Sequence, residues 1–277
     1  MRNARGFTLI ELVVVIAIVG ILIAMAALAT RAITMQQRRS TTATRMATVD
    51  TALIQYVMLQ KRLPCPADGS VASGGANAGI EGVRDPGGCT NETNGVVPWV
   101  ALGITEADIM DGWDRRLTYR IKANLATDNA LDMSNCDPAG GDTTSSVASC
   151  AACTAATIAT CNTPQAFLAT KGLIVRNLAG VAIMDTAAIP ATGAAYVVIS
   201  HGESGGGAML NTGQVSTSIT TDGSEEGKNY ANLALGGYYV DDALSDVAGA
   251  SHFDDIVSRP TLLTVINKAA LGPRSHS

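Results

Sequence analysis

The sequence predicts an α+β protein in which one long amino-terminal helix precedes a small antiparallel sheet with long connecting loops. Two observations point to this fold class. No proline interrupts the chain before Pro64, and this first segment is apolar at its start and amphipathic further on. Later in the chain, short stretches of alternating apolar and polar residues are separated by Gly-rich segments, which is the pattern of short strands joined by loops.

The first element is an apolar run from Leu12 to Ala29, in which every side chain is apolar or glycine. Counted from Phe7, the run is long enough to cross the roughly 30 Å hydrocarbon core of a bilayer as a helix. A cleaved secretory signal and a buried helix of a soluble protein are the two other interpretations. Charge does not orient the span, because arginines lie on both sides of it.

The octapeptide RGFTLIEL at residues 5–12 resembles the processing site of type IV prepilins and of the pseudopilins of type II secretion systems. The resemblance implies that a prepilin peptidase cleaves after Gly6, and that Phe7 becomes the new amino terminus and is N-methylated. It places Glu11 at the position of the glutamate that the family keeps. It also implies a single-pass protein of the bacterial inner membrane, with everything beyond the span outside the cytoplasm and assembled into a pilus or pseudopilus.

Glu11 is an ionisable side chain at the start of an apolar helix, where a charge is expensive and usually functional. After cleavage, the amine of Phe7 in one subunit is expected to pair with Glu11 of a neighbour, which makes both charges tolerable and sets the register between subunits. The alternative is a carboxylate that only reaches the membrane edge. The partners implied are other pilin or pseudopilin subunits, prepilin peptidase, the inner-membrane assembly platform and the membrane itself.

The helix is expected to continue past the membrane as one element of roughly 80 Å that ends near Gln60. Its second half is amphipathic, and arginines repeat every seven residues along it, facing either lipid headgroups or acidic surfaces of adjacent subunits. The predicted segments are a leader (1–6), a membrane-spanning and assembly helix (7–30), its amphipathic continuation (31–62) and a globular domain outside the cytoplasm (63–277). The residues that recur at three- and four-residue spacing on the inward face of the continuation are Met46, Val49, Leu53, Tyr56, Val57 and Gln60, and the arginines are Arg31, Arg38 and Arg45.

Five segments of the globular domain read as strands. Residues 117–122 alternate apolar and polar side chains, and the preceding DGWDRRLTYR at 111–120 resembles a pseudopilin turn that feeds the first strand, with Asp114 in place of its usual glycine. Trp113 is expected to be a core aromatic anchored by this turn. The other strands are expected within 172–178, 194–202, 236–242 and 253–266, the last placed at an edge or ended by Pro260.

The membrane span places the six cysteines in an oxidising compartment, where disulfides persist, and six cysteines allow fifteen pairings. Proximity favours Cys65–Cys89, which leaves four cysteines to staple an insertion at 134–164 that is rich in Ser, Thr, Ala and Gly. The pair Cys150 and Cys153 is alternatively a redox or zinc motif. The four cysteines of the insertion are Cys136, Cys150, Cys153 and Cys161.

The sequence at 202–206 fits the Gly-x-Ser-x-Gly pattern of a nucleophile elbow, in which Ser204 is the nucleophile. The stretch that follows is a poor helix and only His252 and His276 come later, so a Gly-rich turn between strands is favoured. The predicted function is therefore structural and not enzymatic: a filament subunit of the minor pilin or pseudopilin kind. A membrane-anchored extracytoplasmic serine hydrolase and a tip adhesin or ligand-binding module are the alternatives.

No cofactor is required by this function, and an acidic body is unsuited to nucleic acid, because acidic residues outnumber basic ones by 23 to 13 from Asp50 onward. Calcium is considered for the carboxylates that gather late in the chain, because the major pseudopilins, which the amino terminus resembles, bind calcium in their carboxy-terminal part. Solvated loop carboxylates are the favoured interpretation. The residues concerned are Asp241, Asp242, Asp246, Asp254 and Asp255.

Overall fold

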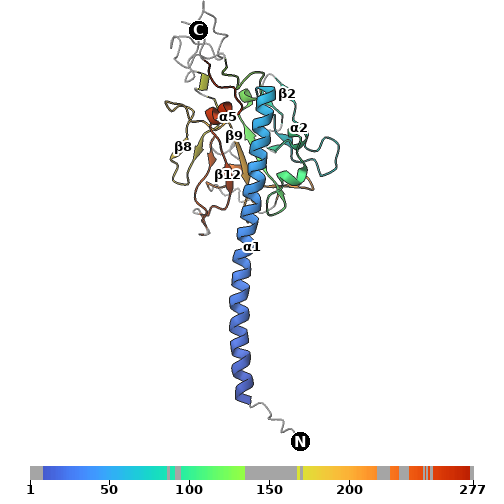
Figure 1. Cartoon of the computed structure of the whole chain (residues 1–277), viewed down its shortest axis with the longest axis vertical. Helices are drawn as coiled ribbons and strands as arrows, with labels where there is room; N and C mark the ends of the chain where they lie inside the picture. The colour runs from blue at the N-terminus through green and yellow to red at the C-terminus, as the bar shows by residue number, and fades with distance from the viewer. Residues whose placement is uncertain are drawn as a thin grey trace, which may run out of the picture.

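The structure, a computed structural model, describes residues 9–85, 88–90, 95–134, 167–168, 171–216, 225–230, 237–245, 247, 249 and 252–274. Its dominant element is helix α1 (Leu9–Gln60), 52 residues long. The carboxyl half of α1 lies along a body of short strands and loops, and its amino half projects away from that body (Figure 1). The predicted α+β arrangement of a long first helix and an antiparallel sheet is confirmed.

Helix α1 ends where the sequence predicts. Lys61 has a left-handed backbone with φ of 57°, and Pro64 follows shortly after, which disfavours a longer helix. Gln60, expected among the inward-facing residues, is instead exposed. It is the last helical residue, and the chain returns to the core only with Leu63, which is fully buried. The inward face of the docked half consists of Thr42, Met46, Val49, Ala52, Leu53 and Val57.

The central sheet has five antiparallel strands in the order β1 (Ala67–Asp68), β4 (Gly95–Val96), β6 (Thr118–Ile121), β9 (Tyr196–Ser200) and β12 (Ile256–Ser258). Strand β9 lies between β6 and β12, with Val198 opposite Tyr119 and Ile199 opposite Val257. Strand β12 is one of the two edge strands of this sheet and ends before Pro260, as predicted, because proline has no N–H to donate to a further partner.

The two faces of the sheet are covered by different layers. Tyr196 and Val198 point to the core shared with α1, whereas Val197 and Ile199 pack against a second sheet, as the alternation of side chains along a strand requires. That second sheet has the order β11 (Tyr239–Val240), β7 (Val175–Arg176) and β8 (Ala182–Met184). The polar side of β6 is covered by this second layer, and Arg120 donates to the carbonyl oxygen of Gly95.

Short elements complete the body. They are β2 (Arg84–Asp85), β3 (Gly88–Cys89), α2 (Trp99–Leu102), the 3-10 helices η1 (Glu106–Ile109) and η2 (Ala123–Leu125), β5 (Arg115–Arg116), β10 (Met209–Leu210) and α5 (Leu262–Lys268). Helix α5 corrects the prediction for 253–266, whose second half is helical. The Thr261 side chain accepts a hydrogen bond from Thr264 N as an N-cap, and apolar residues at helical spacing bury the inward face of α5: Leu262, Val265 and Ile266.

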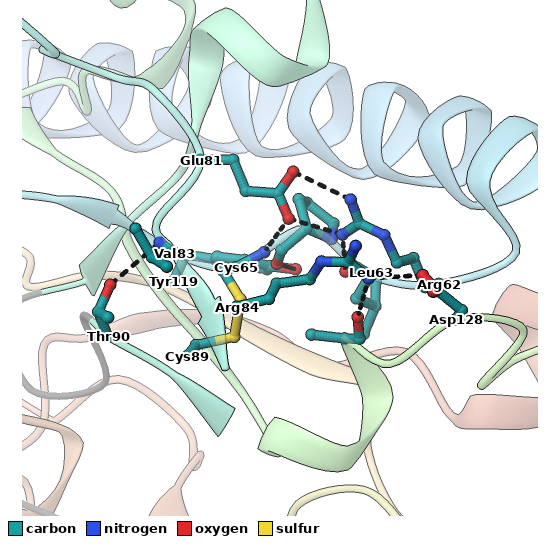
Figure 2. Close-up of a disulfide and its surroundings, with 12 residues drawn as sticks. Arg62, Leu63, Cys65, Glu81, Val83, Arg84, Cys89, Thr90, Tyr119 and Asp128 are labelled. Carbon is teal, nitrogen blue, oxygen red and sulfur yellow. Dashed lines mark hydrogen bonds and ion pairs between the residues drawn. A yellow bond between two sulfur atoms is a disulfide. The ribbon is translucent and has the colours of Figure 1, made fainter. Parts of the chain in front are cut away.

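A disulfide between Cys65 and Cys89 ties the segment that follows α1 to β3 (Figure 2). Beside it, Glu81 accepts hydrogen bonds from Arg62, from the Tyr56 hydroxyl and from Cys65 N. Burial opposes ionisation of Glu81, but these donors, Arg62 first, outweigh it and lower the pKa of the carboxyl group. The end of the helix is thus fixed covalently and electrostatically. Cys136, Cys150, Cys153 and Cys161 lie outside the described residues, as does most of the 134–164 insertion.

Candidate functional site

The projecting half of α1 is the first candidate site. Within the described residues it is the one helix long and apolar enough to cross a membrane, and none of its most apolar stretch is buried by the body. Large apolar side chains such as Ile16 (63% exposed) and Ile23 (64%) extend around its surface. An apolar surface of this length is costly in water, so it requires a bilayer or other apolar helices around it.

Glu11 lies in the first turn of α1. A carboxylate there is favoured by the positive end of the helix dipole, and it is the only acid ahead of Asp50. Gly6 and Phe7, the predicted cleavage and methylation positions, lie outside the described residues. Their roles, and the pairing of Glu11 with a neighbouring amine, stay predictions.

A second feature is the joint where α1 docks on the body. Arg45 donates to the carbonyl oxygens of Met110 and Asp111, at 2.8 and 3.0 Å. Thr42 accepts a hydrogen bond from Gly112 N, and a side chain at Gly112 would place its Cβ 2.3 Å from the carbonyl oxygen of Arg38. The loop therefore touches the helix backbone. Arg45 contacts its own body, which corrects both sequence-based interpretations for this arginine.

The hydrogen bonds and backbone conformation of the DGW turn at this joint explain why these residues occupy it. Buried Asp111 accepts hydrogen bonds from the backbone N–H groups of Trp113 and Arg115 and from the Ser200 hydroxyl. Asp114 has a φ of 61°, a left-handed conformation that glycine adopts without strain, which accounts for the glycine of the resembling pseudopilin pattern. Trp113 is only partly buried, so the expected core aromatic is instead Trp99, which is 6% exposed.

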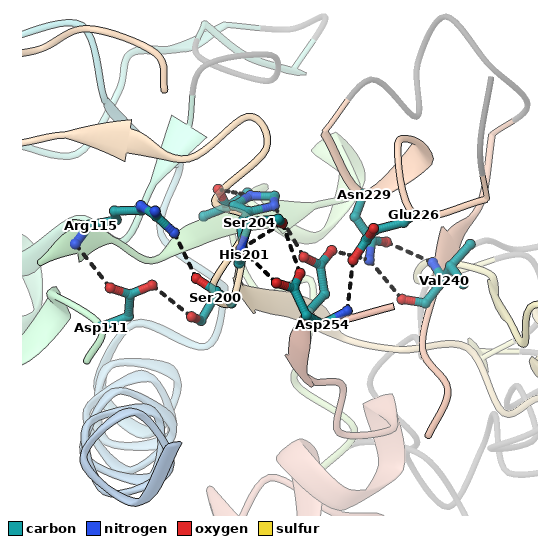
Figure 3. A network of polar contacts seen from close by, with 12 residues as sticks. Asp111, Arg115, Ser200, His201, Ser204, Glu226, Asn229, Val240 and Asp254 are labelled. Carbon is teal, nitrogen blue, oxygen red and sulfur yellow. Dashed lines mark hydrogen bonds and ion pairs between the residues drawn. The ribbon is translucent and has the colours of Figure 1, made fainter. Parts of the chain in front are cut away.

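A buried polar network lies on the other side of this turn (Figure 3). The Ser204 hydroxyl donates to Asp254, at 2.8 Å. The imidazole of His201, 2% exposed, contacts the Thr118 hydroxyl at 2.9 Å and Asp255 at 3.6 Å. A nucleophilic serine needs a base positioned to take its proton and a further group that orients this base. Here the Ser204 hydroxyl donates to one oxygen of Asp254, and the other oxygen accepts a hydrogen bond from Ser204 N at 2.6 Å, an arrangement that closes a turn.

The acidic residues considered for calcium take part in separate contacts. Asp241 pairs with Arg259, Asp242 accepts from Leu178 N, and Asp255 accepts from the Asn229 side chain. Asp246 lies outside the described residues. Within the described part of the chain, one group of His and carboxylate side chains is close enough to hold a metal ion: Glu226, His252 and Asp254.

Sequence reasoning did not single out Glu226, Gly112 or the Thr42–Arg45 clamp. For the joint, the available signal was the short polar DG turn before a strand. For the Glu226 group, it was the His-x-Asp spacing of 252 and 254, which places two ligands on one side of an extended chain.

Comparison with known proteins bears on the amino terminus. Residues 1–27 match the prokaryotic N-terminal methylation motif, which is the prepilin-type signal of type IV pilins and pseudopilins. No curated protein and no solved structure matches the chain. The chain thus carries the signal of a prepilin peptidase substrate that assembles with other pilin subunits, ahead of a long helix and an antiparallel sheet consistent with a pilin-like fold.

Proposed function

We propose that this protein is a structural subunit, of the minor pilin or pseudopilin kind, of a type IV pilus or a type II secretion-like filament. Prepilin peptidase cleaves it after Gly6, Phe7 is N-methylated, and the subunit enters the filament through its amino-terminal helix. Before assembly it resides in the bacterial inner membrane with its body outside the cytoplasm. It performs no catalysis in this role and requires no cofactor.

The observation that carries this proposal is the continuity of the methylation motif with the projecting half of α1. The motif ends at residue 27, and the helix it enters offers an apolar surface that the body leaves uncovered. In a filament, helices of neighbouring subunits supply that cover, and the bodies remain outside. The Cys65–Cys89 disulfide supports a body outside the cytoplasm, because disulfides persist in oxidising compartments.

A minor rather than a major subunit is favoured by the size of the body. It contains most of the 277 residues, including the long 134–164 segment, and a bulky body crowds a lattice in which it would repeat at every position. A subunit present in few copies, or at the tip, avoids this crowding.

The test is the intact mass of the protein extracted from membranes of a host that contains the prepilin peptidase. We expect a chain that begins at Phe7 and carries one additional methyl group. In a host without the peptidase, the same protein should retain residues 1–6. A mature chain that begins at Met1 in the first host, or one cut beyond the apolar run, would contradict the proposal.

The hydrolase alternative has its own test. Replacement of Ser204 by Ala should leave filament incorporation unchanged, and a fluorophosphonate probe should not label the wild-type protein. Labelling of the wild type that disappears in the Ala variant would support the alternative.

A further inference from the structure

Three potential metal ligands from two separate segments meet beside the Ser204 turn. Glu226 comes from the segment 225–230, whereas His252 and Asp254 come from the segment that leads into β12. One Glu226 oxygen accepts from Asp254 N at 2.7 Å, and the other lies 2.9 Å from His252 Nδ1. One ligand atom from each of the three side chains lies within 4.8 Å of the other two.

The charge in this region is unbalanced. Asp254 and Asp255 are 6% and 3% exposed, and Glu226 lies beside them. Their partners are hydroxyl, amide, backbone N–H and imidazole groups, and in the described part of the chain none of the three carboxylates contacts an arginine or lysine. Buried carboxylates are costly unless a cation balances them, and the imidazoles of His201 and His252 do so only when they are protonated. With neutral imidazoles, this location favours a bound cation.

We propose that Glu226, His252 and Asp254 form a binding site for a divalent transition-metal ion, with Zn²⁺ as the best match in chemistry. An imidazole and two carboxylates are common zinc ligands, at about 2.0–2.2 Å from the metal. Tetrahedral geometry then requires ligand atoms about 3.4 Å apart, and the present ligand atoms lie within 4.8 Å of one another. Three protein ligands would leave a fourth position open to water.

The ligand set distinguishes this site from a calcium site. Calcium takes six to eight oxygen ligands, including carbonyl groups, and does not favour an imidazole. Imidazole nitrogen selects zinc and its neighbours in the first transition row. Of the aspartates considered for calcium, only Asp254 belongs to the proposed site.

The position of the site gives the metal a structural role. Ser204 donates to Asp254 through its hydroxyl and backbone N–H, and the adjacent Glu203 lies 3.5 Å from Arg31 of α1. A metal bound by Glu226, His252 and Asp254 therefore links the segment 225–230 to the edge of the central sheet, at the end of the body where α1 leaves it. It stabilises the face of the body that is turned toward the projecting half of the helix.

The test uses the full-length protein in detergent, purified without an oligohistidine tag, with free thiols alkylated so that cysteines do not contribute. After removal of metal with a chelator, Zn²⁺ is titrated against a chromogenic chelator at neutral pH. We expect one equivalent of Zn²⁺ per chain, not displaced by a large excess of Ca²⁺. Co²⁺ in place of Zn²⁺ should give the visible absorption of a low-coordinate site with a nitrogen ligand.

Graded variants assign the binding to these side chains. His252→Ala and Glu226→Gln should each abolish binding of the one equivalent of Zn²⁺. Ser204→Ala, which removes a hydrogen bond to a ligand, should weaken binding by roughly 10–100-fold. Glu203→Gln, a carboxylate on the neighbouring turn, is the matched control and should bind as the wild type does. Circular dichroism and formation of the Cys65–Cys89 disulfide confirm that each variant folds.

Three outcomes would overturn the proposal. The first is a wild-type protein that binds no Zn²⁺, in which case protonation of His252 balances the charge instead. The second is binding that persists in folded Glu226→Gln and His252→Ala. The third is Ca²⁺ binding that Zn²⁺ does not displace.

Discussion

The two halves of α1 belong to one continuous helix but meet different surroundings. In the docked half, Val49, Leu53 and Val57 are fully buried against the central sheet, and Arg45 and Thr42 hold the DGW turn. In the projecting half, apolar side chains extend around the whole helix and the body covers none of the most apolar stretch. The docked half therefore obtains its stability from its own chain, whereas the projecting half depends on lipid and on other subunits.

Because of this difference, mutations in the two halves are expected to impair different properties of the protein. A change in the projecting half should alter assembly and leave the stability of the body unchanged. A change in the docked half should lower the stability of the body, whether or not a filament forms.

The largest effect is expected from Glu11→Val. Membrane insertion becomes easier, because the span loses a charge. On the predicted pairing of Glu11 with the Phe7 amine of a neighbouring subunit, assembly should fail, because that amine loses its partner and breaking a buried ion pair costs roughly 3–5 kcal/mol. The measurement is the fraction of processed subunit recovered in sheared filaments, with Glu11→Asp expected to be intermediate.

Thermal unfolding of the Glu11→Val body should match that of the wild type. Incorporation equal to that of the wild type would show that Glu11 is not an intersubunit contact. A subunit at the extreme tip of the filament has no neighbour above it, so it would tolerate the change even if Glu11 forms the contact elsewhere. Crosslinking to the subunits below it identifies this case.

Leu53→Ala should act in the opposite way. Leu53 is fully buried between α1 and the sheet, and removal of a buried leucine side chain costs about 2–5 kcal/mol of unfolding free energy. Chemical denaturation in detergent measures this loss. Ile16→Ala, at a position 63% exposed in the projecting half, is the matched control and should leave body unfolding unchanged. Equal effects of the two substitutions would refute the separation of the two halves.

Two glycine substitutions, one in the turn at the joint and one in the projecting half, test the same comparison with a smaller change. Gly112→Ala places a methyl group 2.3 Å from the Arg38 carbonyl oxygen, so the turn must shift away from the helix, at a cost of about 1–3 kcal/mol. At Gly20, in the projecting half, an added Cβ meets nothing within 4 Å. Gly20→Ala should therefore leave body stability unchanged. The denaturation midpoints of the two variants provide the comparison, and a neutral Gly112→Ala would mean that the joint is loose.

The smallest effect is a pH dependence at the end of the docked half. The pKa of Glu81 is lowered in the folded protein, mainly because the bonds from Arg62 and its other donors outweigh burial. The resulting stabilisation is complete above the unfolded pKa of about 4.3 and is lost as the pH falls through the lower folded value. Arg62→Gln should reduce stability at neutral pH and flatten its decline between about pH 5 and pH 3. If the stability of Arg62→Gln declines between about pH 5 and pH 3 as that of the wild type does, Glu81 does not cause this pH dependence.

Local patterns account for what could be predicted. The end of α1 near Gln60, the strand at 117–122 and the edge strand before Pro260 follow from periodicity and from proline geometry, which act over a few residues. The burial of Arg120 could not be predicted in this way, because a second sheet from residues 175–240 covers it. Helix α5 was missed because TLLTVI also fits a strand, and its N-cap at Thr261 decided the matter.

By itself, the sequence determined the processing signal at residues 1–27, the apolar span with its single carboxylate, and the long helix that follows, because each depends on neighbouring residues. Only the tertiary structure decided that Arg45 clamps its own body, that Ser204 donates to Asp254, and that Glu226 meets His252 and Asp254. These contacts join residues 26 to 66 positions apart, and such long-range meetings depend on how the sheet and its loops pack and not on any local pattern.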